Sequence, residues 1–356
     1  MSQQLLINLS FFLTKPTGIT TYAVNLLPHL KKLDPTLLIS QNLSGYNCYP
    51  VPANQTAEQG TKGHLRRLVW TQLQLPKIYH QLRAQLLFSP LPEAPLYSNC
   101  RFVVMAHDLI PLRFPKRFSP LTPYHRYYVP QVLKQAQHVI CNSQATADDI
   151  INFYKIPASK ITPIPLAHDR THFRYLNLPT RNYFLYIGRQ DPYKNLQRLI
   201  TAFAALPNKD YELWLAGPTD KRYTPLLQAQ VEELGITHRV KFLNYVDYSQ
   251  LPTIINGAIA LVFPSLWEGF GFPVLEAMAC GTPVITSNLS SLPEVAGDAA
   301  ILINPYNTAE ITDAMQQLAN DTELRSQLSI KGIARANQFS WEKTGQATVE
   351  VLSRFL

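Results

Sequence analysis

The chain has 356 residues, of which 46% are hydrophobic and 16% charged, and its formal net charge at pH 7 is +8. This length suits two domains, and the composition is that of a globular protein with ample core, which excludes a disordered chain. Because no apolar run approaches the roughly 18 to 20 residues that cross a bilayer, we expect no membrane-spanning segment.

The chain begins with MSQQLLINLSFFLTKP, which lacks both a basic region and a small-residue cleavage site. We therefore interpret it as a first strand and not as a signal peptide. The four cysteines show neither paired nor metal-type spacing, which favours free thiols in a reducing cytoplasm. They are Cys48, Cys100, Cys141 and Cys280.

The positive charge is concentrated in the first half of the chain. Residues 1–166 contain 16 Lys and Arg against 6 Asp and Glu, whereas residues 167–356 contain 16 against 18. A basic surface can bind nucleic acid or an anionic membrane, or can serve solubility alone. The sequence carries no DNA- or RNA-binding motif. Segments 62–70 and 113–120 mix Lys and Arg with aromatic residues, which favours a membrane contact.

Short β-rich runs alternate with amphipathic helical stretches along the chain. Such alternation predicts βαβ units and parallel sheets, so the expected fold class is α/β. The expected strands lie at 101–108, 138–143, 183–189, 211–217, 240–246, 258–265 and 282–287, and the helices between them include 195–206, 224–235 and 273–281.

These elements form two series, one that ends near residue 165 and one that starts near residue 183. The stretch between them, 168–182, is polar and contains proline, as interdomain linkers do. We therefore expect an N-terminal domain over 1–166 and a C-terminal domain over 167–340. Because parallel sheets bind ligands at the carboxyl ends of their strands, two such domains facing one another would share a cleft.

Two cationic residues mark the end of the expected strand at 183–189. Arg189 closes this strand, and Lys194 lies just before the next helix opens at Asn195. Cations at a strand end beside a helix N-terminus are typical of sites that bind an anion such as a diphosphate. An ordinary helix start has the same composition, so the pair needs support from elsewhere in the sequence.

The segment PSLWEGFGFPVLEAMACGTPVI, residues 264–285, supplies that support. Gly269 and Gly271 lie in a loop after the strand at 258–265, where they let the backbone approach a ligand closely. Pro273 suits the start of a helix, because the N–H that proline lacks would be unpaired there.

The same segment contains two acids, Glu268 in the loop and Glu276, which we expect in the first turn of the following helix. Helix-dipole stabilisation would explain Glu276 alone, and a solvated loop would explain Glu268 alone. Carboxylates also accept hydrogen bonds from vicinal hydroxyls. Together with Arg189 and Lys194, the two acids favour a ligand with a phosphate centre and a sugar at each end, which is a nucleotide sugar.

The run EGFGFPVLEAMACGTPVI resembles the E-x7-E signature of the retaining glycosyltransferases with the GT-B fold, specifically glycosyltransferase family 4. This resemblance implies two Rossmann-like doubly wound domains that face a central cleft, with the C-terminal helix 341–356 crossing back to the N-terminal domain. The N-terminal domain would bind the acceptor and the C-terminal domain the nucleotide sugar. Similar stretches occur at 105–115, 139–150, 188–195, 240–247, 292–305 and 339–352.

The resemblance also implies roles in donor binding. Glu268 would contact hydroxyls of the donor sugar, and Glu276 the ribose hydroxyls. Arg189 and Lys194 would hold the diphosphate and stabilise the charge that grows on it as the glycosidic bond breaks. The sugar and distal phosphate would lie against the backbone at Gly269, Phe270 and Gly271, and the nucleobase against Tyr245 and Val246.

Two expected site residues lie in the N-terminal half. His107, in the sequence AHD, matches a histidine that borders the donor sugar in the family, although a hydrogen-bonded histidine at a strand end would look the same. Gly18 occupies the place of a glycine-rich first loop. The family commonly has two adjacent glycines there, and this chain has Thr17 before Gly18.

The resemblance implies transfer with retention of configuration, so that a usual α-linked donor yields an α-linkage. Glu268 would position the sugar and would not act as a nucleophile, and the departing phosphate would help to deprotonate the acceptor. The family needs no metal or other cofactor, and the sequence contains no Asp-x-Asp triplet. We therefore expect no metal site and no cofactor.

The donor and acceptor are less closely specified. The stretch SNLSSLPEVAGDAA resembles mannosyl- and rhamnosyltransferase-like members, which slightly favours GDP-mannose over a UDP-sugar. We expect a glycan or lipid-linked acceptor in cell-surface polysaccharide or glycolipid synthesis. The basic N-terminal half suggests a cytoplasmic protein in peripheral contact with the cytoplasmic face of an anionic membrane.

Three alternatives remain. The chain could be a non-catalytic nucleotide-sugar-binding scaffold, against which the full set of candidate residues argues. It could be another enzyme of the same fold, such as an epimerase or a phosphorylase, although an epimerase lacks the E-x7-E loop and a phosphorylase has a much longer chain. A basic protein that binds nucleic acid or membrane is the third, and nucleic acid is not the partner we expect.

Overall fold

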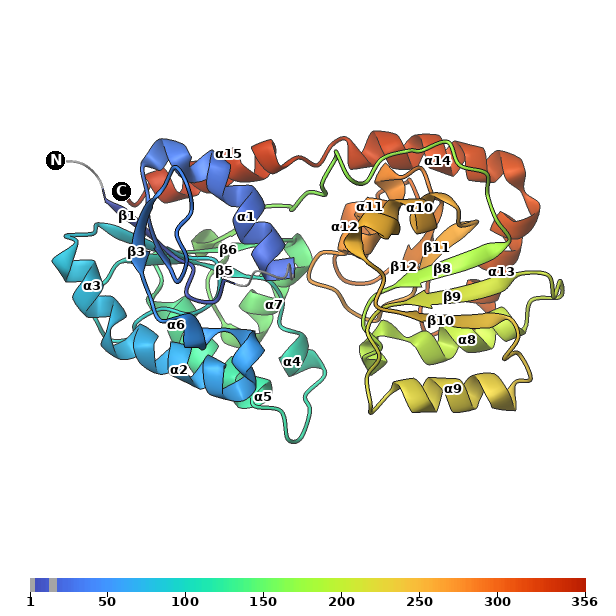
Figure 1. Ribbon diagram of the computed structural model, residues 1–356, viewed down its shortest axis with the longest axis horizontal. Coiled ribbons are helices and arrows are strands. Elements are labelled where there is room, and N and C mark those ends of the chain that lie inside the picture. Colours follow the sequence, from blue (N-terminus) through green and yellow to red (C-terminus); the bar gives the residue numbers. More distant parts are fainter. Residues whose placement is uncertain (1–3, 13–17) are drawn as a thin grey trace. The chain divides into compact units, whose positions relative to one another are not determined.

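The structure is a computed structural model that describes residues 4–12 and 18–356 (Figure 1). The chain forms two compact units. Unit 1 extends to Leu166 and also includes Trp341–Leu356, and unit 2 is Ala167–Ser340. Each unit is an α/β fold built on its own parallel sheet, as the alternation of strands and helices predicts.

The sheet of unit 1 has seven strands in the order β3-β2-β1-β4-β5-β6-β7, and every pairing is parallel. The central strands are buried along their whole length, which explains their continuous apolar runs such as LLFS and FVVMA. The strands are β1 (Leu5–Asn8), β2 (Thr36–Ile39), β3 (Asn47–Pro50), β4 (Leu86–Ser89), β5 (Phe102–Ala106), β6 (His138–Cys141) and β7 (Ile161–Pro163).

Helices cover both faces of this sheet. In Figure 1, α1 and α15 lie side by side on one face, and α2 and α3 lie on the other. The α-helices of unit 1 are α1 (Gly18–Leu30), α2 (Gly60–Leu73), α3 (Leu75–Gln81), α4 (Ile110–Arg113), α5 (Leu121–Pro123), α6 (Val129–Gln135), α7 (Gln144–Tyr154) and α15 (Trp341–Ser353). The shorter turns are η1 (Lys31–Leu33), η2 (Ala53–Gln55), η3 (Ala57–Gln59), η5 (Ala158–Lys160) and the π-helical η4 (Tyr124–Tyr128).

The last helix, α15, belongs to unit 1, which confirms that the C-terminal helix returns to the N-terminal domain. A glycine lets it approach α1 closely, because a Cβ on Gly345 would lie 2.2 Å from Cβ of His29. The Thr344 hydroxyl donates a hydrogen bond to the carbonyl oxygen of Pro165 at 2.7 Å. These contacts anchor the end of the chain on the first unit.

The sheet of unit 2 has six parallel strands in the order β10-β9-β8-β11-β12-β13. Counted within the unit, this order is 3-2-1-4-5-6, the doubly wound Rossmann order. The strands are β8 (Tyr183–Ile187), β9 (Glu212–Ala216), β10 (Val240–Asn244), β11 (Ala260–Phe263), β12 (Val284–Ser287) and β13 (Ile301–Ile303).

The helices of unit 2 also lie on both faces of its sheet. Figure 1 shows α8 and α9 on one side of the strands and α10, α11 and α14 on the other. They are η6 (Pro192–Lys194), α8 (Leu196–Ala204), α9 (Thr224–Glu233), η7 (Tyr248–Gln250), α10 (Leu251–Asn256), α11 (Phe272–Ala279), α12 (Leu292–Ala296), α13 (Thr308–Asn320) and α14 (Thr322–Ala336).

The strand order fixes where each unit is suited to bind a ligand. In a doubly wound sheet the ligand site lies at the carboxyl ends of the two strands where the order reverses. These strands are β1 and β4 in unit 1, and β8 and β11 in unit 2. Each unit therefore has one such switch point.

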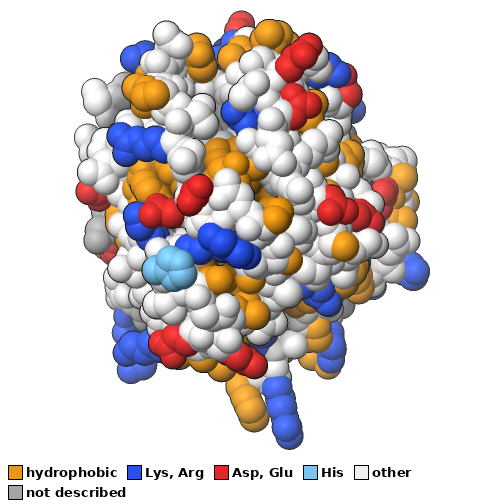
Figure 2. Space-filling view, turned by 90° about the vertical axis from the view of Figure 1, so that its right-hand side faces the viewer, with side chains coloured by type: hydrophobic (Ala, Val, Ile, Leu, Met, Phe, Trp, Pro, Cys, Tyr) orange, Lys and Arg blue, Asp and Glu red, His pale blue; other side chains and the backbone are white. Residues whose placement is uncertain are grey.

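Positive and negative side chains are mixed on one face of the molecule. On the face drawn in Figure 2, Lys and Arg side chains are interspersed with Asp and Glu. None of the helices in the described ranges is both long and apolar enough to cross a membrane.

Candidate functional site

The expected donor site is built at the switch point of unit 2. Strand β8 ends at Ile187 and is followed by Arg189 and by η6, which ends at Lys194. The neighbouring strand β11 ends at Phe263 and leads into the loop that carries Glu268. Parallel pairing of β8 with β11 therefore brings residues that are 74 positions apart to one edge of the sheet.

Lys194 and Glu268 contact each other directly. The Lys194 ammonium donates to Oε1 of Glu268 at 2.6 Å, and both side chains are largely buried, with 12% and 10% of their surface exposed. The ammonium also lies 5.3 Å from the ring centroid of Phe263, close enough for a cation–π contact. This arrangement holds one positive and one negative group at fixed positions beside the strand ends.

Serine side chains hold the loop around Glu268 in place. The backbone N–H of Glu268 donates to Oγ of Ser290 at 3.1 Å. The Ser291 hydroxyl lies 3.1 Å from the Glu268 carbonyl oxygen and 2.7 Å from that of Phe270. Gly271 then enters α11 with φ +112°, a conformation that favours glycine, and a Cβ there would lie 2.8 Å from Leu292.

The turn after β8 is fixed by a buried tyrosine. The Tyr186 hydroxyl donates to the Arg189 carbonyl oxygen at 2.6 Å. Burial, with the negative charges of Glu268 and Asp191 nearby, holds the pKa of Tyr186 well above its usual range. The guanidinium of Arg189 lies 3.1 Å from a carboxylate oxygen of Asp191 and is 66% exposed. Arg189 and Glu268 therefore lie near the same end of β8, and the Arg189 side chain is accessible to a ligand.

A left-handed asparagine links the two sides of the switch point. Asn195 has φ +65°, and its side-chain amide donates to the carbonyl oxygens of Pro264 and Pro305 at 3.1 and 2.7 Å. The backbone N–H of Leu266 donates to the carbonyl oxygen of Tyr193 at 2.7 Å. These bonds tie the turn after β8 to the loop after β11.

Glu276 lies in the second turn of α11, so the expected place in the first turn is wrong by one turn. The helix begins at Phe272, and no acid occupies its first turn. Burial raises the pKa of Glu276 to about 8. Its charge influences Tyr248 and Cys280, and its carboxylate accepts no hydrogen bond from the described residues.

The loop after β10 contains both residues expected near a nucleobase. Tyr245 is 71% exposed, and Val246 is partly buried. Tyr248 follows, and its ring stacks on His172 with the ring centroids 3.8 Å apart. Because Tyr248 also interacts electrostatically with Glu276, this stacked pair adds an aromatic surface beside that acid.

In unit 1, His107 follows the end of β5 and lines a cavity. Its Nε2 lies 2.9 Å from the Pro90 carbonyl oxygen. A carbonyl can only accept, so Nε2 carries the proton and Nδ1 keeps a lone pair. Burial lowers the pKa of His107 to about 4, so the ring is neutral at pH 7.

The glycine expected in the first loop lies at the start of the helix that follows. Gly18 is the first residue of α1 and is exposed, with nothing within 4 Å of a Cβ built there. Thr17, the departure from the family pattern, lies outside the described residues.

Sequence reasoning missed the residues that hold the site together. Tyr186, Asn195, Ser290 and Ser291 bond mainly to backbone groups, and all but Tyr186 are more than 20 positions from the segments they hold. A signal existed for Asn195 alone, because asparagine tolerates left-handed backbone at a helix start. Within the described residues no group of three or more His, Cys, Asp and Glu could hold a metal ion.

Comparison with known proteins agrees with this architecture. The model of the family described as "Glycosyl transferases group 1" matches residues 168–335. The model of "Glycosyltransferase Family 4" matches residues 16–172. The two matches overlap at residues 168–172 and together extend from residue 16 to residue 335.

Among curated proteins, the O-antigen chain mannosyltransferase B of Escherichia coli is 33% identical over 61% of this chain and 60% of its own length. The O-antigen chain mannosyltransferase RfbU of Salmonella typhimurium is 29% identical over 88% of this chain and 90% of its own length. The chain thus spans less than two thirds of the first relative and most of the second.

Solved structures share the fold at low identity. Sucrose-phosphate synthase from Thermosynechococcus elongatus has a TM-score of 0.79 at 19% identity, covering 99% of this chain and 98% of that one. HepE from Anabaena, in complex with UDP and glucose, has a TM-score of 0.77 at 20% identity, covering 99% of this chain and 100% of that one.

Proposed function

Because the chain belongs to the family 4 glycosyltransferases of group 1, we propose that it moves a sugar from a nucleotide-sugar donor to a hydroxyl of a glycan or lipid-linked acceptor. The observation that supports this best is the buried Lys194–Glu268 pair at the switch point of unit 2. We propose GDP-mannose as the preferred donor, since two of the most similar curated proteins are O-antigen mannosyltransferases.

In this proposal, each of the four side chains acts on one part of the donor. Lys194 and the exposed Arg189 hold the diphosphate and stabilise its developing charge, which is the interaction that lowers a barrier most. Glu268 accepts from hydroxyls of the sugar, and Glu276 from those of the ribose. When the donor binds, part of the contact between Lys194 and Glu268 is replaced by contacts of these two side chains with the donor.

The proposed reaction retains the configuration of the sugar. The bond from the anomeric carbon to the diphosphate oxygen breaks, and a bond from that carbon to the acceptor oxygen forms on the same face. The acceptor proton passes to the departing phosphate, so the products are the glycoside and a nucleoside diphosphate. Glu268 makes no covalent bond. Nε2 of His107 donates to Pro90, so Nδ1 keeps a lone pair with which it accepts from a substrate hydroxyl in this proposal.

We propose that this reaction needs no metal ion, because Lys194 and Arg189 supply the positive charge beside the diphosphate. Transfer activity should therefore persist unchanged in excess EDTA. A loss of activity that Mg²⁺ or Mn²⁺ restores would contradict this part of the proposal.

We further propose that unit 1 contacts an anionic membrane. Leu65, Val69 and Leu73 lie on one face of α2 and are 62%, 48% and 59% exposed. The cations Lys62 and Arg66 are exposed on the same face, since residues three and four apart are neighbours on a helix. Apolar and cationic side chains on one helical face are typical of interfacial binding. Elsewhere in the same unit, Phe118 and Tyr127 are also exposed, at 90% and 67%.

The test measures sugar transfer from UDP- and GDP-sugars to lipid-linked oligosaccharide, with the anomer assigned by NMR. The informative variant is K194M/E268Q, which removes both charges and so leaves no unpaired charge buried. We expect at least about a hundredfold loss of transfer with the fold intact.

The matched control is K241M/E212Q, because Lys241 and Glu212 form an exposed ion pair in the same unit, 2.8 Å apart. It should transfer like the wild type. A wild-type rate in K194M/E268Q, as in the control, would contradict the proposed function. So would a β-linked product from an α-linked donor.

A further inference from the structure

A second ligand site is indicated in unit 1, where a cavity of about 650 Å³ opens at the switch point between β1 and β4. Its volume lies within the range of small-molecule sites. Phe11 follows β1, Glu93 follows β4 and His107 follows β5, while α1, α2 and the segment 119–125 complete the wall. None of the donor residues of unit 2 belongs to it.

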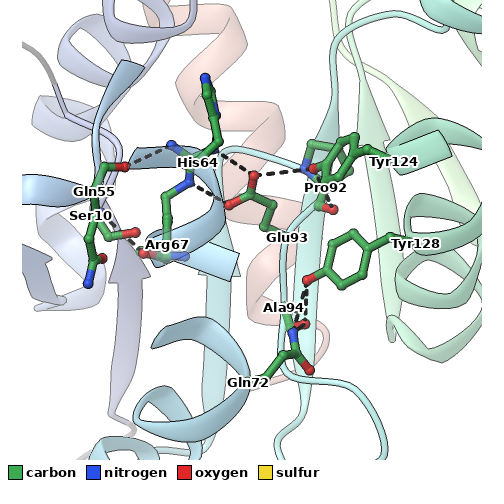
Figure 3. A network of polar contacts seen from close by, with 11 residues as sticks. Ser10, Gln55, His64, Arg67, Gln72, Pro92, Glu93, Ala94, Tyr124 and Tyr128 are labelled. Atoms are coloured by element: carbon green, nitrogen blue, oxygen red, sulfur yellow. Dashed lines mark hydrogen bonds and ion pairs between the residues drawn. The ribbon is translucent and has the colours of Figure 1, made fainter. Parts of the chain in front are cut away.

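A buried ion pair forms part of this wall. Arg67 donates from Nε and Nη2 to the two carboxylate oxygens of Glu93, at 2.7 Å each, and both side chains are about 5% exposed. Figure 3 shows Arg67 between Gln55, His64 and Glu93. Its Nη1 donates to the Gln55 carbonyl oxygen at 3.1 Å, and the Tyr124 hydroxyl donates to Glu93 at 3.3 Å. The pair is thereby fixed in position and mutually neutralised.

Arg67 also determines the tautomer of His64 and helps to lower its pKa. Nη2 of Arg67 lies 3.0 Å from Nδ1 of His64, which lines the cavity. A guanidinium donates and never accepts, so Nδ1 must be the acceptor and the neutral ring carries its proton on Nε2. Burial and the charge of Arg67 lower the pKa of His64, while Glu93 opposes this shift. In Figure 3 the imidazole extends away from Arg67, with its second ring nitrogen at the far side.

The remaining lining is apolar and carries little charge. Among the described lining residues, the charged ones are Arg67, Glu93 and Asp108, so no cation is left unpaired to bind a phosphate. Burial lowers the pKa values of His107 and His125 to about 4, so both rings are neutral at pH 7. Nδ1 of His125 is buried without a hydrogen-bond partner in the described part of the chain.

We propose that His64 selects what enters this cavity: by donating from Nε2 it favours an uncharged, hydroxyl-bearing segment of the acceptor, such as its terminal sugar, over an anionic one. Arg67 is a positioning residue that holds the imidazole of His64 in this tautomer. A hydroxyl both donates and accepts, and the neutral rings of His64 and His107 offer an N–H and a lone pair. The inference rests on the proposed function only in taking the bound segment to be the acceptor.

The tautomer is tested without activity, by NMR of the full chain with ¹⁵N-labelled histidine, using H64Q to assign the signal. We expect the neutral ring of His64, at pH 7 to 8, to carry its proton on Nε2 and none on Nδ1. The R67M/E93L variant removes both charges, so it should fold, and its His64 should no longer be held in the Nε2 tautomer, because Nδ1 has lost the donor that Arg67 supplies. A wild-type His64 that is charged at pH 7, or protonated at Nδ1, would overturn the proposal.

Ligand selection is tested with two probes of equal chain length, n-octyl α-D-mannopyranoside and n-octyl phosphate, below their micelle concentrations. The mannoside should bind and the phosphate should not. H64F should weaken mannoside binding roughly tenfold, about the value of one hydrogen bond. H64Q should preserve binding, because its amide can accept from Arg67 and still donate.

Equal binding of both probes, or wild-type affinity in H64F, would overturn the inference. The outcome is separable from that of the proposed function. Mannoside binding that depends on His64, in a protein without transfer activity, would refute only the proposed function. An active enzyme whose acceptor KM is unchanged in H64F would refute only the selection by His64.

Discussion

Single residues in this protein are tuned by their partners. Lys194 and Glu268 lie 2.6 Å apart, so neither charge is exposed alone beside the strand ends. His107 is fixed by a backbone carbonyl as a donor at Nε2, whereas His64 is fixed by Arg67 as an acceptor at Nδ1. The two histidines therefore present opposite hydrogen-bonding groups to one cavity, although both are neutral.

Glu276 should make the stability of the protein depend on pH. Its pKa is raised to about 8 in the folded protein, so the folded state binds the proton more tightly than the unfolded chain does. Its contribution to stability is complete below about pH 4.5 and is lost as pH rises toward 8. E276Q should therefore unfold at a higher temperature than the wild type at pH 8.5, by about 2–4 °C for each kcal/mol regained, and at a similar temperature at pH 4.5. A difference of equal size at both pH values would contradict this assignment.

At the scale of elements, the entry into α11 determines the shape of the donor loop. Gly271 has φ +112° and leaves no room for a Cβ beside Leu292 of α12, while Ser291 bonds to the carbonyl oxygens of Glu268 and Phe270. The loop, α11 and α12 are therefore packed as one structural unit around the carboxyl end of β11.

G271A is expected to cost about 1–3 kcal/mol, because a side chain is strained at this φ and its Cβ would overlap Leu292. Donor affinity, measured by calorimetric titration, should fall along with stability. G332A is the matched control, since a Cβ in α14 would meet Met278 at an ordinary 3.4 Å and alanine favours a helix. A G271A protein with wild-type stability and affinity would show that this loop is not shaped as described.

The fold could be predicted from sequence because buried parallel strands consist of consecutive apolar residues. Runs such as YFLYIGR and AIALVFPS correspond to β8 and β11 within a few residues, and the α/β class with a returning C-terminal helix is confirmed. The turn of α11 that holds Glu276 was predicted wrongly, because the residue that begins a helix depends on the backbone at Gly271.

The contacts inside the sites could not be predicted in the same way. Lys194 meets Glu268 only because β8 and β11 are neighbours, and Arg67 meets Glu93 only through the packing of α2 beside β4. Sequence spacing carries no information on such pairs. The candidate donor residues were found by their motif, whereas the cavity of unit 1 has no motif and became visible only in the structure.

At the scale of the whole molecule, charge is unevenly distributed. Residues 1–166 carry an excess of ten positive charges, while residues 167–356 are slightly acidic. The exposed apolar residues of α2 belong to the basic part of the chain. Attraction of basic residues to anionic lipid is screened by salt, so contact with a membrane should depend on ionic strength.

The variant L65S/V69S/L73S should bind vesicles of phosphatidylglycerol and phosphatidylcholine at least about tenfold more weakly than the wild type at low salt, because three apolar side chains no longer enter the interface. Cosedimentation measures this. The control L226S/I330S removes apolar residues that are 58% and 71% exposed on unit 2, and should bind like the wild type. If the α2 variant retained full binding, this surface would not be the membrane contact.

In the proposed function, the switch point of unit 2 binds an activated sugar through Lys194 and Glu268. Calorimetric titration of GDP-mannose and UDP-glucose into the wild type, K194M/E268Q and K241M/E212Q measures this binding. We predict saturable binding of at least one donor to the wild type and to the K241M/E212Q control, and a loss of about tenfold or more in K194M/E268Q. Equal affinity in all three proteins, or no binding of either nucleotide sugar, would contradict it.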